Sequence, residues 1–410
     1  MNIDKDTIKK IVTLYGSTFI GVGLGFAISV FNTRVLGKEA FGDFKFIETV
    51  FRFLASLVSV GIFISITRML AIAKSKIYTH RLIGFFVIAL AIAGAIGVIL
   101  LLIFSFVEPI WFSGNLGHIF RQYSFLIFAI LGSIALREIL KGLNKIYTLS
   151  VLNAVPAILY LVIAYSFNLK NPLHLEDILL LFYGLQLLFL IVIIIKLKPK
   201  FDIKKSLVKD VIHENNTNGK PIYYGSLAGV ATAHIVGFSL SYYIDNTQVG
   251  FFTLAMTVCS PLIMIPSVLG TVLFKKFANF DYIPKKVIIF SILATVLALI
   301  VFYVFIERVF LLFYSEDFTP AIDISKILIF GFLLHGFGDL INRFLGANGK
   351  GKLLRNSAFV VGIVNVLGYT ILVKYFGVTG AIVTKIFASA TYLFMMYYYY
   401  TKFIKKNKYV

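Results

Sequence analysis

Residues 82–107 read LIGFFVIALAIAGAIGVILLLIFSFV, a stretch without a single Asp, Glu, Lys or Arg. An α-helix needs about 20 such residues to cross the roughly 30 Å hydrocarbon core of a bilayer. The apolar residues are continuous and do not alternate with polar ones, which excludes a strand of a closed membrane barrel. This stretch therefore predicts a transmembrane helix, and with it an all-α membrane protein.

The composition of the whole chain agrees with this prediction. Of the 410 residues 59% are hydrophobic and 14% charged, and the mean hydropathy is +0.91. A soluble protein of this size could not bury so many apolar side chains, because an average soluble domain has about 25% charged residues. The composition therefore excludes a soluble enzyme, a secreted disulfide scaffold and a disordered chain.

Twelve apolar stretches of this length follow one another and predict twelve transmembrane helices. Their approximate ranges are 9–35, 44–70, 82–107, 120–141, 146–168, 177–197, 220–243, 249–274, 286–313, 321–346, 353–375 and 378–402.

The twelve predicted helices divide into two halves that resemble each other. We expect a six-helix bundle over 1–197, a basic linker over 198–219 and a second bundle over 220–410. Gly142-Leu-Asn-Lys145 resembles Gly346-Ala-Asn-Gly-Lys350, and the offset between the two motifs is close to half the chain length. Two repeats of the same orientation predict an axis along the membrane normal, as in several transporter folds.

The distribution of Lys and Arg predicts the orientation in the membrane. The chain carries a formal charge of +20. Of its 39 Lys and Arg residues, 26 lie in the termini and even-numbered connections and only 7 in the odd-numbered ones. Cytoplasmic loops carry the excess of these residues, so both termini are expected in the cytoplasm. The excess of Lys and Arg in cytoplasmic loops explains the net positive charge, so no nucleic acid is expected as a partner.

The linker is the longest connection between predicted helices. Apolar residues from Phe201 to Ile212 stand among its lysines at a spacing compatible with a helix on the membrane surface. Such a helix would tether the two halves and attract anionic membrane lipid. A solvated cytoplasmic linker is the alternative interpretation.

The motifs of common enzyme classes are missing from the sequence. It contains no Walker loop, no G-x-S-x-G elbow and no H-E-x-x-H, and its six His residues show no zinc-ligand spacing. The single cysteine, Cys259, lies in an apolar stretch. We therefore expect no enzymatic activity, no cofactor and no metal.

Ionisable residues inside predicted helices are the candidates for function, because each is costly in lipid unless it faces protein or water. Glu48 and Arg52 lie four residues apart and share a helix face. With Arg34, His234 and Lys385 they predict a cavity that is cationic on balance. The alternatives are a structural Glu48–Arg52 ion pair and a His234 that bonds a backbone carbonyl.

His335, Asp339 and Arg343 form a second group, each four residues from the next and thus on one helix face. Together with Glu48 they are the candidates for coupling or gating, since proton-coupled transporters use Asp/His chains of this kind. A structural network between helices is the alternative.

Three motifs resemble those of one protein family. Arg34-Val-Leu-Gly-Lys-Glu-Ala-Phe-Gly42 resembles the R-x-L-G-x-x-x-(Y/F)-G signature that follows the first helix of polysaccharide-biosynthesis flippases. Tyr314-Ser-Glu-Asp-Phe318 resembles the element ahead of their tenth helix. Asn365 and the segment from Tyr375 to Thr384 resemble the N…FG-x-x-G-A-x-x-(A/S)-T stretch of their last two helices.

This resemblance implies an O-antigen-type flippase of the multidrug/oligosaccharidyl-lipid/polysaccharide exporter superfamily, with two six-helix bundles forming a V around a central cavity. The implied substrate is an undecaprenyl-pyrophosphate-linked oligosaccharide, supplied by glycosyltransferases and consumed by a polysaccharide polymerase. Related lipid II flippases use arginines of their first two helices for the pyrophosphate. Arg34 and Arg52 lie on the matching helices.

Two other functions remain open at this stage. A cation-coupled multidrug exporter of the same superfamily commonly has a buried acid in its first or seventh helix. Here the first predicted helix has none, and the seventh has none before Asp245 at its outer edge, which favours the lipid flippase. The other alternative is a scaffold of a polysaccharide assembly complex that transports nothing itself.

Overall fold

A computed structural model describes residues 5–112 and 114–407, so the extreme ends of the predicted cytoplasmic termini lie outside it. Over these ranges the chain is helical, with turns and no strands. Eight helical segments within them are long and apolar enough to cross a membrane. The predicted all-α, multi-pass membrane fold is thus confirmed. The chain separates into two compact units, 1–227 and 228–410.

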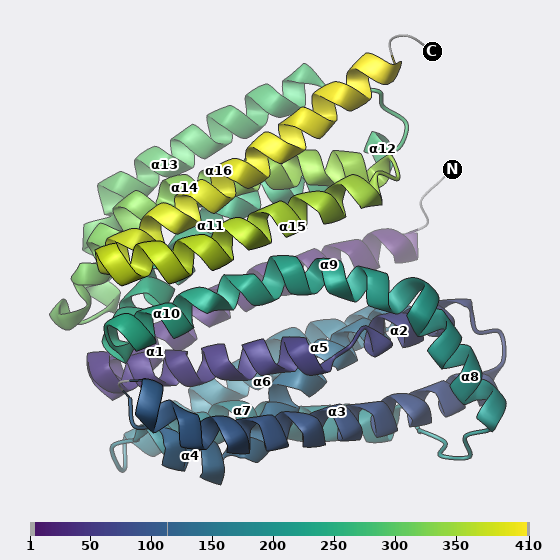
Figure 1. Ribbon diagram of the computed structural model, residues 1–410, viewed down its shortest axis with the longest axis horizontal. Helices are drawn as coiled ribbons and strands as arrows, with labels where there is room; N and C mark the ends of the chain where they lie inside the picture. Colours follow the sequence, from purple (N-terminus) through teal and green to yellow (C-terminus); the bar gives the residue numbers. More distant parts are fainter. Residues whose placement is uncertain (1–4, 113, 408–410) are drawn as a thin grey trace. The chain divides into compact units, whose positions relative to one another are not determined.

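The helices of the two units are coloured along the sequence in Figure 1. The first unit contains α1 (Lys5–Val58), α2 (Ile62–Ile72), α3 (Lys76–Trp111), α4 (Gly117–Gln122), η1 (Ser124–Leu126), α5 (Ile127–Gly142), α6 (Ile146–Asn168), α7 (Leu175–Lys196), α8 (Lys205–Glu214), η2 (Asn215–Gly219) and most of α9 (Lys220–Val230). The second contains η3 (Ala231–His234), α10 (Ile235–Tyr243), α11 (Asn246–Val272), α12 (Phe274–Phe277), α13 (Lys285–Phe313), η4 (Glu316–Phe318), α14 (Pro320–Ala347), α15 (Gly351–Leu367), η5 (Gly368–Leu372) and α16 (Val373–Asn407).

Two glycines of the family-like motifs separate predicted helices. Gly37 interrupts α1 with a φ of 70°, and Gly377 interrupts α16 with a φ of 55°. Only glycine adopts such angles without steric cost, so both motifs place a break where one apolar stretch ends and the next begins. Helix α1 therefore has two segments: the one before Gly37 contains the first predicted span, and the one after it contains part of the second.

Several predicted spans are less regular than expected. The second is broken at Ser59–Gly61, where Val60 has a φ of 43° and Gly61 a φ of 76°. The fourth begins in α4 and η1 before α5, and the seventh consists of α9, the 3₁₀ segment η3 and α10. Hydropathy predicts where apolar helix lies in the chain, but it carries no information on such interruptions.

In each unit long helices pack side by side (Figure 1). In the first unit α1 packs against α6, and α7 packs against α5 and α6. In the second unit α14 lies between α11 and α16. Gly338 permits the close approach to α16, because a Cβ there would lie 2.6 Å from the Tyr392 ring.

One face of α3 is left open by the first unit. Ile92, Ile99 and Phe106 recur every seven residues and are 57%, 57% and 66% exposed. A soluble protein rarely exposes such a continuous apolar surface, whereas a helix that borders lipid does so by necessity.

The linker predicted over 198–219 is partly helical and packs on the first unit. Leu207 and Val211 of α8 are buried, and α8 and η2 contact α2. The Lys200 N–H donates to the His80 carbonyl at 2.9 Å, and Arg81 pairs with Asp202. The segment thus contains an amphipathic helix, α8, as its spacing indicates. The buried face of this helix packs against protein.

Candidate functional site

The part of α1 that follows the break at Gly37 carries an ion cluster in the first unit. Lys45, Glu48 and Arg52 are three and four residues apart, so one turn of helix brings their side chains together. The Glu48 Oε1 accepts from Arg52 Nε at 2.9 Å and Nη2 at 2.8 Å. The Glu48 Oε2 accepts from Lys45 Nζ at 2.9 Å. The predicted Glu48–Arg52 pair is therefore present, and Lys45 is a third member that the sequence analysis had not singled out.

The three side chains differ in how far they are exposed. Arg52 is 46% exposed, whereas Glu48 and Lys45 are 16% and 15% exposed. Both bonds to Glu48 come from the Nε edge of the guanidinium, and Nη1 takes part in neither. The cluster thus holds Arg52 by one edge and presents a second edge, of the kind that binds a carboxylate or phosphate through two parallel bonds.

Tyr183 of α7 lies beneath this cluster. It is 1% exposed and its ring packs on Phe51 and Phe182, with centroids 5.8 and 5.0 Å away. Its hydroxyl interacts electrostatically with both Glu48 and Arg52, yet it has no hydrogen-bond partner among the described residues. Sequence reasoning missed Tyr183, because an aromatic residue in an apolar stretch indicates packing or an interfacial belt.

A second cluster joins α14 and α16 in the other unit. The Tyr392 hydroxyl donates to Asp339 Oδ1 at 2.9 Å, and the Tyr392 ring stacks on His335 with a centroid distance of 4.6 Å. Lys385 lies within electrostatic range of both His335 and Asp339, with its ammonium 5.3 Å from the Phe332 ring centre.

Lys385 is therefore a neighbour of the predicted coupling residues, although the sequence had grouped it with the residues expected to bind substrate. Arg343 belongs to the same helix face, as predicted, but it is exposed and packs on Gly270 of α11. Tyr392 of α16 thus contacts both residues, through a hydrogen bond to Asp339 and a ring contact with His335.

The two other predicted residues lie at interruptions of helices. Arg34 is exposed and stands three residues before the Gly37 break, which separates it from the segment that carries Arg52. His234 is half-buried at the end of η3, within the composite seventh span. Thr232, two residues earlier, accepts from the Asn365 amide at 3.3 Å, so the predicted motif residue Asn365 secures η3 to α15.

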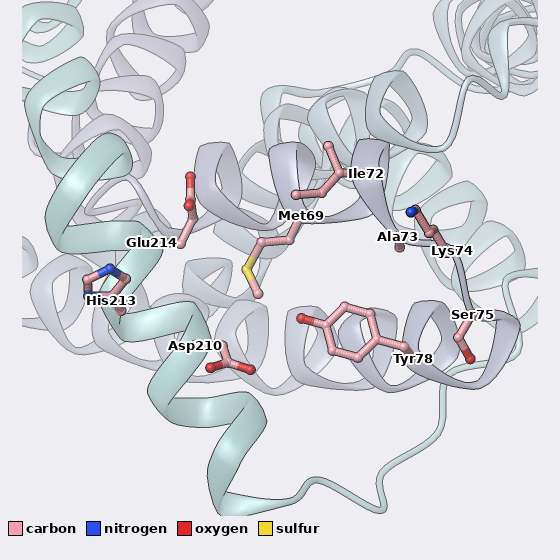
Figure 2. Close-up of a pocket in the computed structure, with 9 residues that line it drawn as sticks. All are labelled: Met69, Ile72, Ala73, Lys74, Ser75, Tyr78, Asp210, His213 and Glu214. Carbon is pink, nitrogen blue, oxygen red and sulfur yellow. The ribbon is translucent and has the colours of Figure 1, made fainter.

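A cavity of about 520 Å³ lies in the first unit between α2, α3 and α8. Figure 2 shows Asp210, His213 and Glu214 of α8 on one side, and Lys74 and Tyr78 on the other. Glu214 is paired with Arg68 at 2.6 Å, and residues of both charge signs line the space. This lining does not favour an anionic ligand over a cationic one.

Comparison with known proteins identifies the family. Residues 7–279 match the family model described as polysaccharide biosynthesis protein. The chain belongs to this family. No curated protein sequence matches it significantly. The family resemblance predicted from the sequence motifs is thereby confirmed, and the motif around Gly37 lies within the matched residues.

Solved structures show which fold this member of the polysaccharide biosynthesis family has. The lipid II flippase MurJ in an inward closed conformation matches with a TM-score of 0.74 and 15% identity, over 94% of this chain and 87% of that one. An inward-facing multidrug resistance MATE family transporter of the MOP superfamily matches with a TM-score of 0.71 and 16% identity, over 98% and 99%. A MOP superfamily transporter from Pyrococcus furiosus, whose binding pocket is described as having reverse polarity, matches with a TM-score of 0.60 and 16% identity, over 98% and 96%.

Proposed function

We propose that this chain is a flippase that moves an undecaprenyl-pyrophosphate-linked oligosaccharide from the cytoplasmic to the outer leaflet of a bacterial inner membrane by alternating access. Membership of the polysaccharide biosynthesis family supports a role in surface polysaccharide assembly. The fold shared with a lipid II flippase is compatible with a lipid-linked substrate. Glycosyltransferases would supply this substrate and a polysaccharide polymerase would consume it.

The observation that carries the proposal is the arrangement of Arg52. A guanidinium inside a membrane-spanning segment is costly unless it faces water or a partner, and Glu48 satisfies only one of its edges. Arg cannot be deprotonated in a protein, and its planar fork matches two phosphate oxygens. A diphosphate head group is the part of the proposed substrate that such an edge would bind.

The matching experiment replaces Arg52 by Ala and by Lys in cells that depend on the flippase. Glu48 keeps its bond to Lys45 when Arg52 is removed, so the Arg52→Ala protein is expected to fold and insert. We expect lipid-linked oligosaccharide to accumulate on the cytoplasmic leaflet, with export reduced about tenfold or more, as for loss of a charge-assisted hydrogen bond. Arg52→Lys should recover part of the export, because it restores the charge without the fork.

A double substitution separates substrate binding from a merely structural ion pair. If Arg52 served only to neutralise Glu48, the Glu48→Ala, Arg52→Ala protein would export normally, and the proposal would be wrong. Efflux of cationic drugs that is lost in Arg52→Ala, together with normal glycan export, would instead support the multidrug exporter. Protein amount and membrane insertion of every variant are measured by immunoblot.

A further inference from the structure

Arg137 of α5 is a second cation beside Arg52. Helix α5 packs against α1 and α7, the two helices that carry Arg52 and Tyr183. The Arg137 side chain is exposed, and the two guanidinium groups are close enough to repel each other. The adjacent acid, Glu138, pairs with Lys141 at 2.6 Å, and over the described part of the chain Arg137 forms no ion pair.

The cluster therefore has an unbalanced charge. Lys45, Arg52 and Arg137 outnumber the single acid Glu48 by two positive charges. Like charges repel each other, and the repulsion grows as the effective dielectric constant around them falls. An excess of this size is stabilised when an anion of about equal and opposite charge lies between the cations.

A third group also points to a ligand. The Tyr183 hydroxyl is buried beneath Arg52 with no hydrogen-bond partner in the described residues, although buried polar groups nearly always have one. A phenol can donate to a phosphate oxygen, and such a bond would satisfy this group when the site is occupied.

We propose that Arg137 is the second arm of a clamp in which Arg52 and Arg137 each bind one phosphoryl group of a diphosphate-linked lipid. This inference rests on the proposed function, since it takes the Arg52 edge as a phosphate site. Lys45 keeps Glu48 neutralised, so Arg52 can turn its free edge to the ligand without leaving an unpaired acid. A monophosphate has one phosphoryl group and engages one arm.

The test measures binding of farnesyl diphosphate and farnesyl monophosphate to the full-length protein in nanodiscs by isothermal titration calorimetry. The wild type is expected to bind the diphosphate more tightly. Arg137→Ala should weaken diphosphate binding about tenfold or more while changing monophosphate binding less than about threefold. Arg52→Ala should weaken both. Arg68→Ala serves as the matched control, because Arg68 is an exposed arginine of the same unit paired with Glu214, and it should change neither.

Stability without ligand gives an independent readout. Removing one of two repelling cations should raise the thermal unfolding midpoint of Arg137→Ala, whereas a structural role for Arg137 predicts a decrease. Arg137→Gln, which keeps a polar side chain of similar length, covers the case in which the Ala variant does not fold.

The outcomes that contradict the clamp differ from those that contradict the proposed function. If Arg52→Ala weakens binding and Arg137→Ala changes nothing, or weakens both ligands equally, the clamp is wrong and the Arg52 site stands. If the wild type binds neither farnesyl phosphate, the phosphate site at Arg52 is wrong as well.

Discussion

Asp339 shows how a single residue can be tested apart from its neighbours. It accepts a hydrogen bond from Tyr392 at 2.9 Å and lies within electrostatic range of Lys385. Asp339→Asn keeps an oxygen for the Tyr392 bond and removes the charge, so we expect a folded protein. If the cluster relays protons, glycan export should fall strongly and lose its dependence on the proton gradient.

The control for this prediction is Asp323→Asn. Asp323 lies in the first turn of the same helix and is 79% exposed, 4.0 Å from Lys326, so its charge is weakly coupled to the rest of the molecule. Normal export in Asp339→Asn, with unchanged dependence on the proton gradient, would show that His335 and Asp339 have a purely structural role.

The sequence predicts contacts along one helix and misses those between helices. The pairing of Glu48 with Arg52 and the shared face of His335 and Asp339 follow from four-residue spacing alone. The approach of Lys385 to Asp339 depends on the register of α16 against α14. No periodicity within either segment encodes that register, so Lys385 was grouped with other residues.

At the level of elements, the break at Ser59–Gly61 is held by two residues, Asn215 near the end of the predicted linker and Tyr223 just after it. The Tyr223 hydroxyl donates to the Leu57 carbonyl at 2.7 Å. Asn215 accepts from the Ser65 hydroxyl at 3.1 Å and donates to the Val60 carbonyl at 3.4 Å. These bonds supply partners for backbone groups that a continuous helix would have paired internally.

Gly219 makes this contact possible, and its replacement gives a stability prediction. A Cβ at Gly219 would lie 2.1 Å from Ser65 Oγ and 2.8 Å from the Gly61 carbonyl oxygen. Gly219→Ala should therefore force η2 away from α2 and destabilise the first unit by about 1–3 kcal/mol, as overpacking does elsewhere. The measurement is the thermal unfolding midpoint of the detergent-purified protein.

Gly184→Ala is the matched control for Gly219→Ala. Gly184 lies inside α7 with nothing within 4 Å of a built Cβ, so alanine should be neutral or slightly stabilising there. Equal midpoints for the two variants would show that the α2–η2 contact contributes little. The break itself was not predictable, because Ser59–Gly61 stands inside an apolar stretch and its partners are more than a hundred residues away.

For the molecule as a whole, hydropathy predicts the order and type of nearly every element, since lipid demands helices that satisfy their own backbone. The breaks at Gly37 and Gly377 were also anticipated, as each lies between two predicted spans. The boundary between the two compact units falls at Leu227 and Ala228, inside the helical run from α8 to α10. A compact unit is defined by packing between distant segments, and the expected linker packs with the first unit.

Orientation in the membrane gives the last prediction. The excess of Lys and Arg in the even-numbered connections predicts that η2 lies in the cytoplasm. A cysteine at Asn216, which is exposed, should react with a membrane-impermeant maleimide only after the cells are permeabilised. The native Cys259 is fully buried and donates to the Ser325 carbonyl, so it should give little background. Asn171→Cys, in the exposed connection between α6 and α7, is the control and should react in intact cells. The opposite labelling pattern would show that the chain has the inverted orientation in the membrane. Export toward the outer leaflet would then have to begin from the opposite face of the protein.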